Sequence, residues 1–312
     1  MKQLFNYCPV MGYEKQIAAY PGQLQGYLCD NHLDGVELNV YDTKPYPDDY
    51  RETAIGVHLK YWPMWLDFWQ HNGKQPETNK LAASYAVQAS NNEEWLDIIC
   101  QNLRVALSYE PEYLVWHVSD CNLEEMFTRK YVHTDEEVID ATIAIVNEIV
   151  GMLPEHTYLL FENLWWPGLT FRKPCLAEKL LVGVKFSHVG FMLDTGHLMN
   201  SNWELTSEAE GIKFVMDTVR SLGEIGKYIK GMHLNCSLSG NFQRAHLGPM
   251  PKVNDLGELI NFVSNLDQHR PFQKESLKPL LELVQPEYLN HELFFNTMEH
   301  MSGLLRQQQA LL

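Results

Sequence analysis

Residues 190–197 read Gly-Phe-Met-Leu-Asp-Thr-Gly-His, an apolar run that ends abruptly in an acidic residue, a small turn and a histidine. Short apolar runs bounded by polar or turn-forming residues are typical of strands buried in a parallel sheet. The same pattern recurs along the whole chain. It predicts eight strands, at residues 3–7, 35–40, 54–59, 113–118, 158–162, 190–194, 229–234 and 288–294.

Longer amphipathic segments separate these runs and predict helices at residues 93–107, 135–152, 176–182, 207–222, 256–266 and 274–284. Strands that alternate with helices favour parallel βαβ units, and eight units predict an α/β fold, a single (β/α)8 TIM barrel over residues 1–312. An open doubly wound sheet is the alternative, but residues 8–12, after the first strand, lack its Gly-rich turn. Residues 60–92 and 235–266 are longer than bare connections, so we expect lid insertions after strands 3 and 7.

The composition restricts the partners and the location of the protein. Its 312 residues include 24 Lys or Arg and 40 Asp or Glu, which gives a formal net charge of −16. An acidic surface repels phosphate backbones and therefore disfavours nucleic acid as a partner. The six cysteines are scattered, the first residues lack the apolar core of a signal peptide, and no apolar run is long enough to span a membrane. We therefore expect a cytoplasmic protein with free thiols and no membrane partner.

The polar residues at the ends of the predicted strands are the informative feature for function. They are His58, His117, Glu162, Asp194, His197, His233 and Glu292. Each histidine alone is more often structural than a ligand, and a lone acid can simply cap a loop. The carboxyl ends of barrel strands meet at one mouth, however, where three buried carboxylates without a cation would repel one another. The set therefore predicts a divalent-metal site.

Several of these stretches resemble motifs of the xylose isomerase-like TIM-barrel superfamily, which includes sugar epimerases, sugar-phosphate isomerases and the endonuclease IV family (AP endonuclease family 2). Asp194-Thr195-Gly196-His197 resembles its D-T-x-H element, His233-Leu234-Asn235 its H-L-N element and Glu162-Asn163 its E-N element. Glu292 falls where the last strand's glutamate is expected, and Asp267-Gln268-His269 resembles a D-x-H pair. The resemblance runs from about residue 34 to residue 295 and implies the barrel fold.

The resemblance implies one of two metal centres. The epimerase branch implies one ion, bound by Glu162, Asp194, His233 and Glu292. The endonuclease IV branch implies a three-zinc cluster that also uses His58, His117, His197, Asp267 and His269. The residues that follow His58 and His117 depart from the endonuclease pattern, and the D-x-H pair lies later in the chain than expected. His246 is therefore an alternative to His269.

Two classes of activity follow, and the residue types leave both open. The function that we expect first is a sugar or sugar-phosphate isomerase or epimerase with one Mn, Mg or Zn ion, because the aromatic residues near the expected ligands favour a sugar substrate. It would act through an enediolate, with Glu162 and Glu292 as the acid and the base. The second is an endonuclease IV-like phosphoesterase with two or three zinc ions. A barrel that binds a sugar without turnover is a third alternative. The resemblance is also compatible with a homo-oligomer.

Residues beside the expected ligands are candidates for substrate contact. They are Trp165, Trp166, Asn163, Asn235 and Lys60. Aromatic faces at a barrel mouth suit stacking on a sugar, although a Trp-rich segment can also serve only to pack a loop. Glu37 lies in the second predicted strand. We expect it either to hold a metal-ligand residue in its orientation through a hydrogen bond, or to be a buried structural carboxylate.

Overall fold

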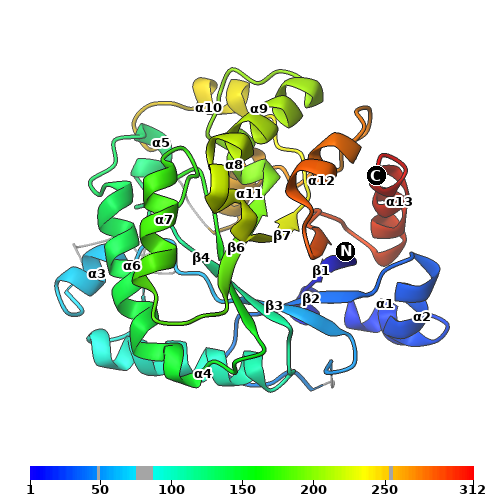
Figure 1. The fold of residues 1–312 in the computed structure, drawn as a ribbon, viewed down its shortest axis with the longest axis horizontal. Coiled ribbons are helices and arrows are strands. Elements are labelled where there is room, and N and C mark those ends of the chain that lie inside the picture. Colours follow the sequence, from blue (N-terminus) through cyan, green and yellow to red (C-terminus); the bar gives the residue numbers. More distant parts are fainter. Residues whose placement is uncertain (48–49, 75–86, 253–255) are drawn as a thin grey trace.

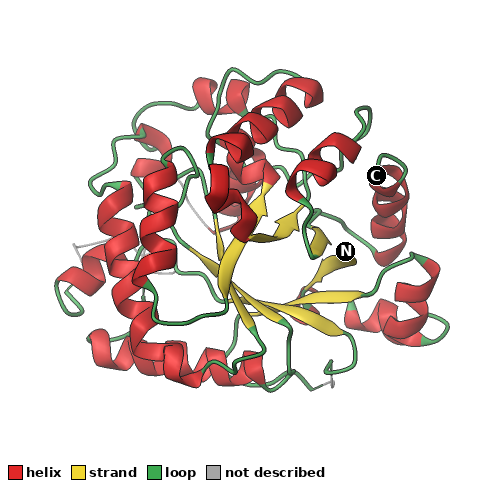
Figure 2. Ribbon diagram, in the orientation of Figure 1, coloured by secondary structure: helices red, strands yellow, loops and turns green. Residues whose placement is uncertain are grey.

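The computed structural model describes residues 1–47, 50–74, 87–252 and 256–312. Within these ranges, eight parallel strands form a closed barrel in sequence order, surrounded by helices (Figures 1 and 2). The predicted (β/α)8 TIM barrel is therefore confirmed. The strands are β1 (Lys2–Tyr7), β2 (Gly35–Val40), β3 (Ala54–Leu59), β4 (Tyr113–His117), β5 (Tyr158–Glu162), β6 (Val189–Asp194), β7 (Ile229–His233) and β8 (Tyr288–His291).

The end of β8 differs from its prediction and matters for the site. The strand ends at His291 rather than at residue 294. Beyond it, the chain pairs with the loop around His269, whose carbonyl accepts the N–H of Phe294 at 3.0 Å. Glu292 therefore lies in a turn at the barrel mouth instead of continuing the strand.

Helices lie between the strands along the chain. They are α1 (Glu14–Ala18), α2 (Gln23–Asp30), α3 (Leu66–Gln70), α4 (Asn92–Leu107), α5 (Glu125–Thr128), α6 (Asp135–Ile149), α7 (Pro174–Gly183), α8 (Thr195–Asn200), α9 (Glu208–Ser221), α10 (Gly240–Ala245), α11 (Leu256–Leu266), α12 (Lys278–Val284) and α13 (Met298–Gln309). A capping box between Thr134 and Glu137 starts α6. The prediction for α12 was too long at its start, because the carboxylate of Glu208 accepts the N–H groups of Gln273 and Lys274 and holds that stretch as a loop.

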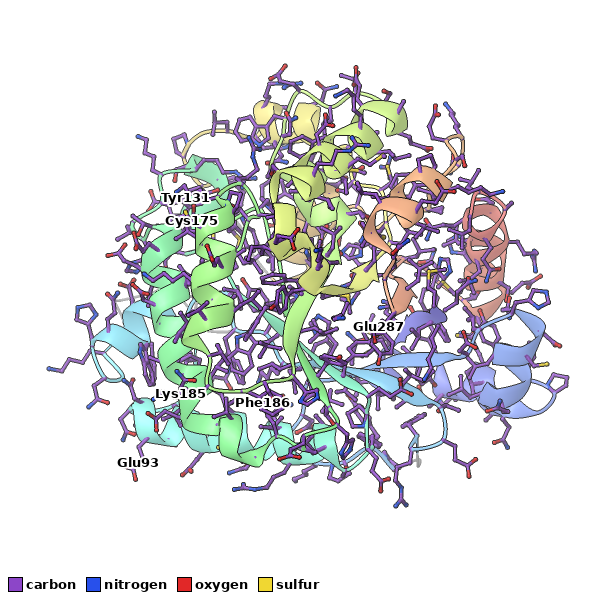
Figure 3. The ribbon with its side chains drawn as sticks, in the orientation of Figure 1. Glu93, Tyr131, Cys175, Lys185, Phe186 and Glu287 are labelled. Atoms are coloured by element: carbon purple, nitrogen blue, oxygen red, sulfur yellow. The ribbon has the colours of Figure 1, made fainter. Side chains whose placement is uncertain are left out.

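Side chains fill the barrel and the layer between it and the helices (Figure 3). A separate hydrophobic cluster joins the loops after β3, β4 and β5 to α11. Its buried members are Met64, Cys121, Leu123, Met126, Phe127, Leu164, Trp165, Trp166, Leu259 and Leu266. This second core holds the long loops in place over the carboxyl ends of the strands.

The two long segments predicted as lids are partly described. Tyr61 and Pro63, from the segment after β3, and Val263, from α11 in the segment after β7, line one cavity. Residues 75–86 of the first segment lie outside the described residues. Lid behaviour therefore stays a prediction.

Two further features bear on the predicted location. All six cysteines are free thiols; Cys175 on α7 is exposed (Figure 3), whereas Cys121 and Cys236 are buried. Within the described ranges, none of the helices combines the length and the apolar character that a membrane crossing needs.

Candidate metal centre

Four side chains meet at the carboxyl ends of β5 to β8. They are Glu162, Asp194, His233 and Glu292, whose potential ligand atoms all lie within 4.8 Å of one another. Nδ1 of His233 is 3.0 Å from Oε2 of Glu292 and 3.3 Å from Oε1 of Glu162. These three atoms are buried, and among the described residues none of them has a hydrogen-bond partner of suitable geometry. Because buried polar atoms are nearly always paired, their convergence indicates a missing partner at this point.

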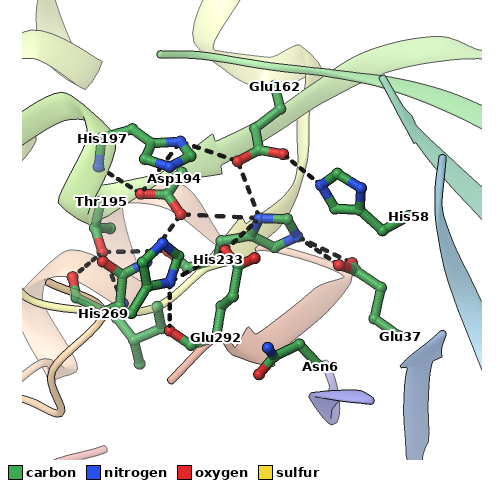
Figure 4. Close-up of polar contacts among 12 residues, drawn as sticks. Asn6, Glu37, His58, Glu162, Asp194, Thr195, His197, His233, His269 and Glu292 are labelled. Atoms are coloured by element: carbon green, nitrogen blue, oxygen red, sulfur yellow. Dashed lines mark hydrogen bonds and ion pairs between the residues drawn. The ribbon is translucent and has the colours of Figure 1, made fainter. Parts of the chain in front are cut away.

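A second group shares Glu162 with the first. Nε2 of His117 is 2.8 Å from Oε2 of Glu162, and Nε2 of His58 is 3.2 Å from the same oxygen. The two nitrogens are 3.0 Å apart. One oxygen of Glu162 thus faces His58 and His117, while the other faces His233 and His197 (Figure 4). A carboxylate placed between two sets of ligands has the arrangement of a bridging ligand.

The third group comes from α8, which follows β6 directly, and from the loop after α11. Oδ2 of Asp267 is 2.6 Å from Nε2 of His269 and 3.2 Å from Nε2 of His197. His246, the alternative to His269, lies elsewhere: it is exposed at the end of α10, with its ring against Phe242. The structure therefore brings His269, and not His246, to the site.

The histidines are oriented in the way that metal ligands usually are. In four of them one ring nitrogen donates to a fixed oxygen and the other faces a ligand group: His58 to Leu59 O, His197 to Asn163 O, His269 to Glu292 O and His233 to Glu37. Such outer contacts set the tautomer and orientation of a ligating imidazole. Aromatic rings also pack against three cavity-facing imidazoles: Tyr61 on His117, Trp165 on His197 and Phe294 on His269.

Glu37 lies behind His233 and is fully buried. Its Oε2 accepts Nε2–H of His233 at 3.0 Å and the hydroxyl of Tyr113 at 2.7 Å. A carboxylate behind a histidine raises the basicity of the nitrogen that faces the metal. The structure thus gives Glu37 the geometry of a positioning residue for His233.

Asp194 is held by the two asparagines that were predicted to contact substrate. Asn163 pairs through its amide with the main chain of Asp194, and Asn235 donates to Oδ2 of Asp194 at 2.8 Å. The other oxygen of Asp194 caps α8 by accepting the N–H of His197 at 2.6 Å. Through these contacts both asparagines hold Asp194, one of the predicted metal-ligand residues, in position. Contact of either asparagine with a substrate stays a prediction.

Burial and neighbouring charges perturb the ionisation of the centre. Burial opposes ionisation of Glu162, but His117 and His233 outweigh it and hold the pKa of Glu162 well below its ordinary value. Burial, reinforced by Glu292 and Glu162, raises the pKa of Asp194 to about 7. Burial lowers the pKa of His269, yet Asp267 and Glu292 together raise it to about 10. Glu162 is therefore held as a carboxylate beside the imidazoles, whereas Asp194 is readily protonated near neutral pH.

The spacing of the ligand atoms suits divalent cations. Two ligands bound tetrahedrally to one zinc at about 2.1 Å are separated by about 3.4 Å. The observed separations of 2.8–3.2 Å around Oε2 of Glu162, and of 3.0–3.9 Å around Nδ1 of His233, are close to this value. Imidazole and carboxylate ligands fit zinc and also manganese. The residues present therefore fit the metals that the sequence predicted.

A cavity of about 380 Å³ opens above the three groups. Its floor contains the ligand residues His58, His117, His197, Asp267, His269 and Glu292. Trp166 belongs to its wall, whereas Trp165 lies against His197. Lys60 is placed differently from its prediction as a cavity residue: its ammonium lies over the ring of Trp62, 5.1 Å from the centroid, beside a separate small pocket.

Comparison with known proteins agrees with this architecture. No protein family model and no curated protein matches the chain. A D-psicose 3-epimerase solved in the presence of D-fructose is similar, with a TM-score of 0.57 and 11% identity over 100% of this chain and 99% of its own. Endonuclease IV from Thermus thermophilus has a TM-score of 0.54 and 14% identity, covering 100% and 98%. The IOLI protein with a bound zinc atom has a TM-score of 0.54 and 15% identity, over 99% of this chain and 97% of its own.

The chain shares the (β/α)8 TIM-barrel fold of these three proteins. At these identities the likeness establishes the fold and leaves the activity open. In this barrel, all nine predicted metal-ligand residues lie in the three groups described above.

The cavity of the barrel also has residues that the sequence did not reveal. Asn6 near the end of β1, Asn39 near the end of β2, and Tyr41 and Phe294 beyond strand ends all line it. An amide near a strand end is the signal that could have identified the two asparagines. Nothing in the sequence near Tyr113, at the start of β4, pointed to its contact with Glu37.

Proposed function

We propose that the chain is a multinuclear divalent-metal enzyme that hydrolyses a phosphate ester of a small molecule. The observation that carries this proposal is the position of Glu162, whose two oxygens face separate groups of imidazoles. One ion would use only the group around His233. The ligands of the other two groups are also mostly buried, and their imidazoles are held by hydrogen bonds or by packed rings, which supports three ions, with Glu162 as a ligand shared between two of them.

The charge of the centre supports the same conclusion. Four carboxylates belong to the three groups: Glu162, Asp194, Asp267 and Glu292. A single ion at His233 would leave the charge of Asp267 to be balanced by the imidazoles beside it, since the pKa of His269 is raised to about 10. Three divalent ions would outweigh the four carboxylates and attract a phosphate group.

The chemistry divides between the ions and the chain. Bound divalent ions lower the pKa of water and neutralise the charge on phosphate oxygens. The chain would hold the ions in fixed positions, because most of its imidazole ligands are themselves oriented by a hydrogen bond or a packed ring. Tyr61, Trp166 and Met126 line the cavity above them.

An isomerase is the second candidate, and the aromatic wall that includes Trp166 is the observation that favours it. Enediolate chemistry needs two proton-transfer groups within reach of the substrate. Glu292 lines the cavity, but Glu162 is fully buried beneath the imidazoles. This difference places the isomerase second. A barrel without turnover is less consistent with nine oriented ligand residues.

Hydrolysis of bis(4-nitrophenyl) phosphate by zinc- or manganese-loaded protein tests the proposal. We expect metal-dependent release of nitrophenol that Glu162→Gln reduces at least about a hundredfold, since this change removes a shared charge. Glu282→Gln, on the exposed face of α12, is the matched control and should leave the rate unchanged. The same preparations are incubated with D-fructose in deuterium oxide. Exchange of a carbon-bound proton without ester cleavage would contradict the proposal and favour the isomerase.

A further inference from the structure

The cavity above the metal centre has two chemically different sides. The floor consists of metal-ligand residues, whereas most of the wall is apolar or aromatic. The wall residues are Tyr41, Tyr61, Pro63, Met126, Trp166, Val263 and Phe294. A ligand that fills this space therefore places its anionic group on the floor and an uncharged body against the wall.

Basic side chains are missing from this arrangement. Among the residues that the structure describes, those lining the cavity include neither Lys nor Arg. A polynucleotide carries further phosphates on both sides of the reacting one, and proteins neutralise these with basic side chains. A substrate with a single anionic group needs no such contacts. The cavity therefore suits a small ester rather than a nucleic-acid strand.

Asn39 gives the wall a specific polar contact. It is 5% exposed, and Oδ1 of its amide is buried without a hydrogen-bond partner in the described part of the chain. Its Nδ2 donates to the hydroxyl of Tyr41 at 2.9 Å, and its main-chain carbonyl accepts the hydroxyl of Tyr46 at 2.6 Å. These contacts fix the side chain and leave one acceptor without a donor, a costly arrangement unless a ligand supplies the donor.

Asn6 complements Asn39 on the same side of the cavity. Residue 6 pairs with residue 37 in the sheet, so Asn39 lies two positions farther along the neighbouring strand. Oδ1 of Asn6 accepts the N–H of Leu293 at 3.2 Å, which leaves its Nδ2 as a donor. Asn6 lies beside Glu292 in the close-up view (Figure 4). Together the two amides offer one donor and one acceptor, a pair that matches a hydroxyl group or an amide edge.

We infer that the substrate is a small phosphate ester with a flat, uncharged organic part that carries a hydroxyl or N–H donor, and that Asn39 determines specificity by accepting that donor. This inference rests on the proposed hydrolase function for its phosphate group. The recognition by Asn39 follows from the cavity wall alone. The two parts can therefore fail separately.

The test compares two chromogenic diesters, each with one negative charge. The 4-nitrophenyl ester of thymidine 5′-monophosphate carries a hydroxyl and an imide N–H, whereas bis(4-nitrophenyl) phosphate carries neither. The metal-loaded enzyme should prefer the thymidine ester by at least about tenfold in kcat/KM, the value of one well-formed hydrogen bond. Asn39→Leu should abolish the preference, so that kcat/KM for the thymidine ester falls to the value for the second ester measured with the same variant. Asn261→Leu, on the exposed side of α11, is the matched control and should keep the preference.

Asn39→Asp is a second variant for the case that Asn39→Leu does not fold, since the aspartate keeps a hydrogen-bond acceptor at the same position. The added negative charge should lower kcat/KM for both anionic esters by a similar factor, so the ratio of the two kcat/KM values should stay the same. An unchanged ratio in Asn39→Leu, or faster cleavage of abasic duplex DNA than of either ester, would overturn the inference.

If neither ester is cleaved, calorimetry with thymidine 5′-monophosphate and phenyl phosphate separates the two failures. Tighter binding of the nucleotide that Asn39→Leu abolishes would support recognition by Asn39 and reject the hydrolase. Equal binding of the two compounds would reject recognition by Asn39.

Discussion

The Nε2–H of His233 donates to Oε2 of Glu37 at 3.0 Å, and both side chains are completely buried. This contact fixes His233 with Nδ1 toward Glu162 and Glu292. It ties an acid on β2 to a ligand on β7 across the interior of the barrel. The bond is thus part of the framework that holds the metal centre.

We predict that Glu37→Gln weakens binding of the ion at His233 by about 10- to 100-fold, the usual effect of losing such an outer contact. Competition titration with a fluorescent zinc chelator measures it. Tyr113→Phe, which removes only the hydroxyl that Glu37 accepts, should have a smaller effect in the same direction. Unchanged affinity in Glu37→Gln would show that His233 needs no support.

Gly196 provides the second prediction. A Cβ at this position would lie 1.8 Å from Oδ1 of Asn235, whose amide donates to Asp194. Gly196→Ala should therefore displace Asn235, lower the free energy of unfolding by about 1–3 kcal/mol and weaken metal binding. Gly303→Ala on α13, where a Cβ meets nothing within 4 Å, is the matched control and should be neutral or stabilising. Equal stabilities of the two variants in urea unfolding would contradict the prediction.

Metal removal should destabilise the protein. Ions that bind only the folded state stabilise it by about 2.7 kcal/mol per site at a hundredfold excess over Kd. Removal of three ions should therefore cost about 8 kcal/mol and lower the Tm of this 312-residue chain by about 12 °C. His269→Ala should show a smaller loss on chelation, because it removes a ligand of the third group. His246→Ala should behave like the unmodified protein, since His246 is exposed and outside the groups. Differential scanning calorimetry with and without chelator measures the loss of Tm for both variants. A smaller loss in His246→Ala than in His269→Ala would instead indicate His246 as the metal ligand.

Asp120 predicts a pH dependence away from the metal centre. It is buried, and its Oδ1 accepts the N–H groups of Trp65 and Leu66 at the start of α3. Burial raises its pKa to about 6 from 3.8, so the folded state favours the protonated acid. The protonated acid therefore contributes to the free energy of unfolding. This contribution is present in full below about pH 4, and about 3 kcal/mol of it is lost as the pH rises through 6.

Asp120→Asn, which keeps the accepting oxygen, should remove this dependence and flatten the stability curve between pH 4 and pH 8. Urea unfolding across that range measures it, with Asp97→Asn, an exposed acid on α4, as the control. A curve for Asp120→Asn that parallels the control would refute the assignment.

Much of the architecture could be predicted because strand and ligand signals are local. Apolar runs marked β2, β3 and β5 to the residue, and the barrel topology brings residues as distant as His58 and Glu292 to one mouth. The start of α12 and the end of β8 could not be predicted, since they depend on contacts with Glu208 of α9 and with His269, which lie far away in the sequence.

The polar lining was harder to predict than the ligands. Asn163 and Asn235 stand beside ligands in the sequence, but only the fold shows that their amides hold Asp194. Asn39 resembles any polar residue near a strand end, and its unpaired oxygen becomes apparent only in the packed structure. Residue type and spacing therefore indicate where ligands meet, whereas the direction of each amide depends on tertiary packing.

The most direct test of the central claim is a count of metal ions per chain by plasma emission spectrometry, on protein purified without chelators and then loaded with zinc or manganese. Three occupied groups predict three ions per chain, and Glu162→Gln should lose more than one ion because Glu162 belongs to two groups. A maximum of one ion per chain, with the same value in His58→Ala and His269→Ala, would contradict a multinuclear centre.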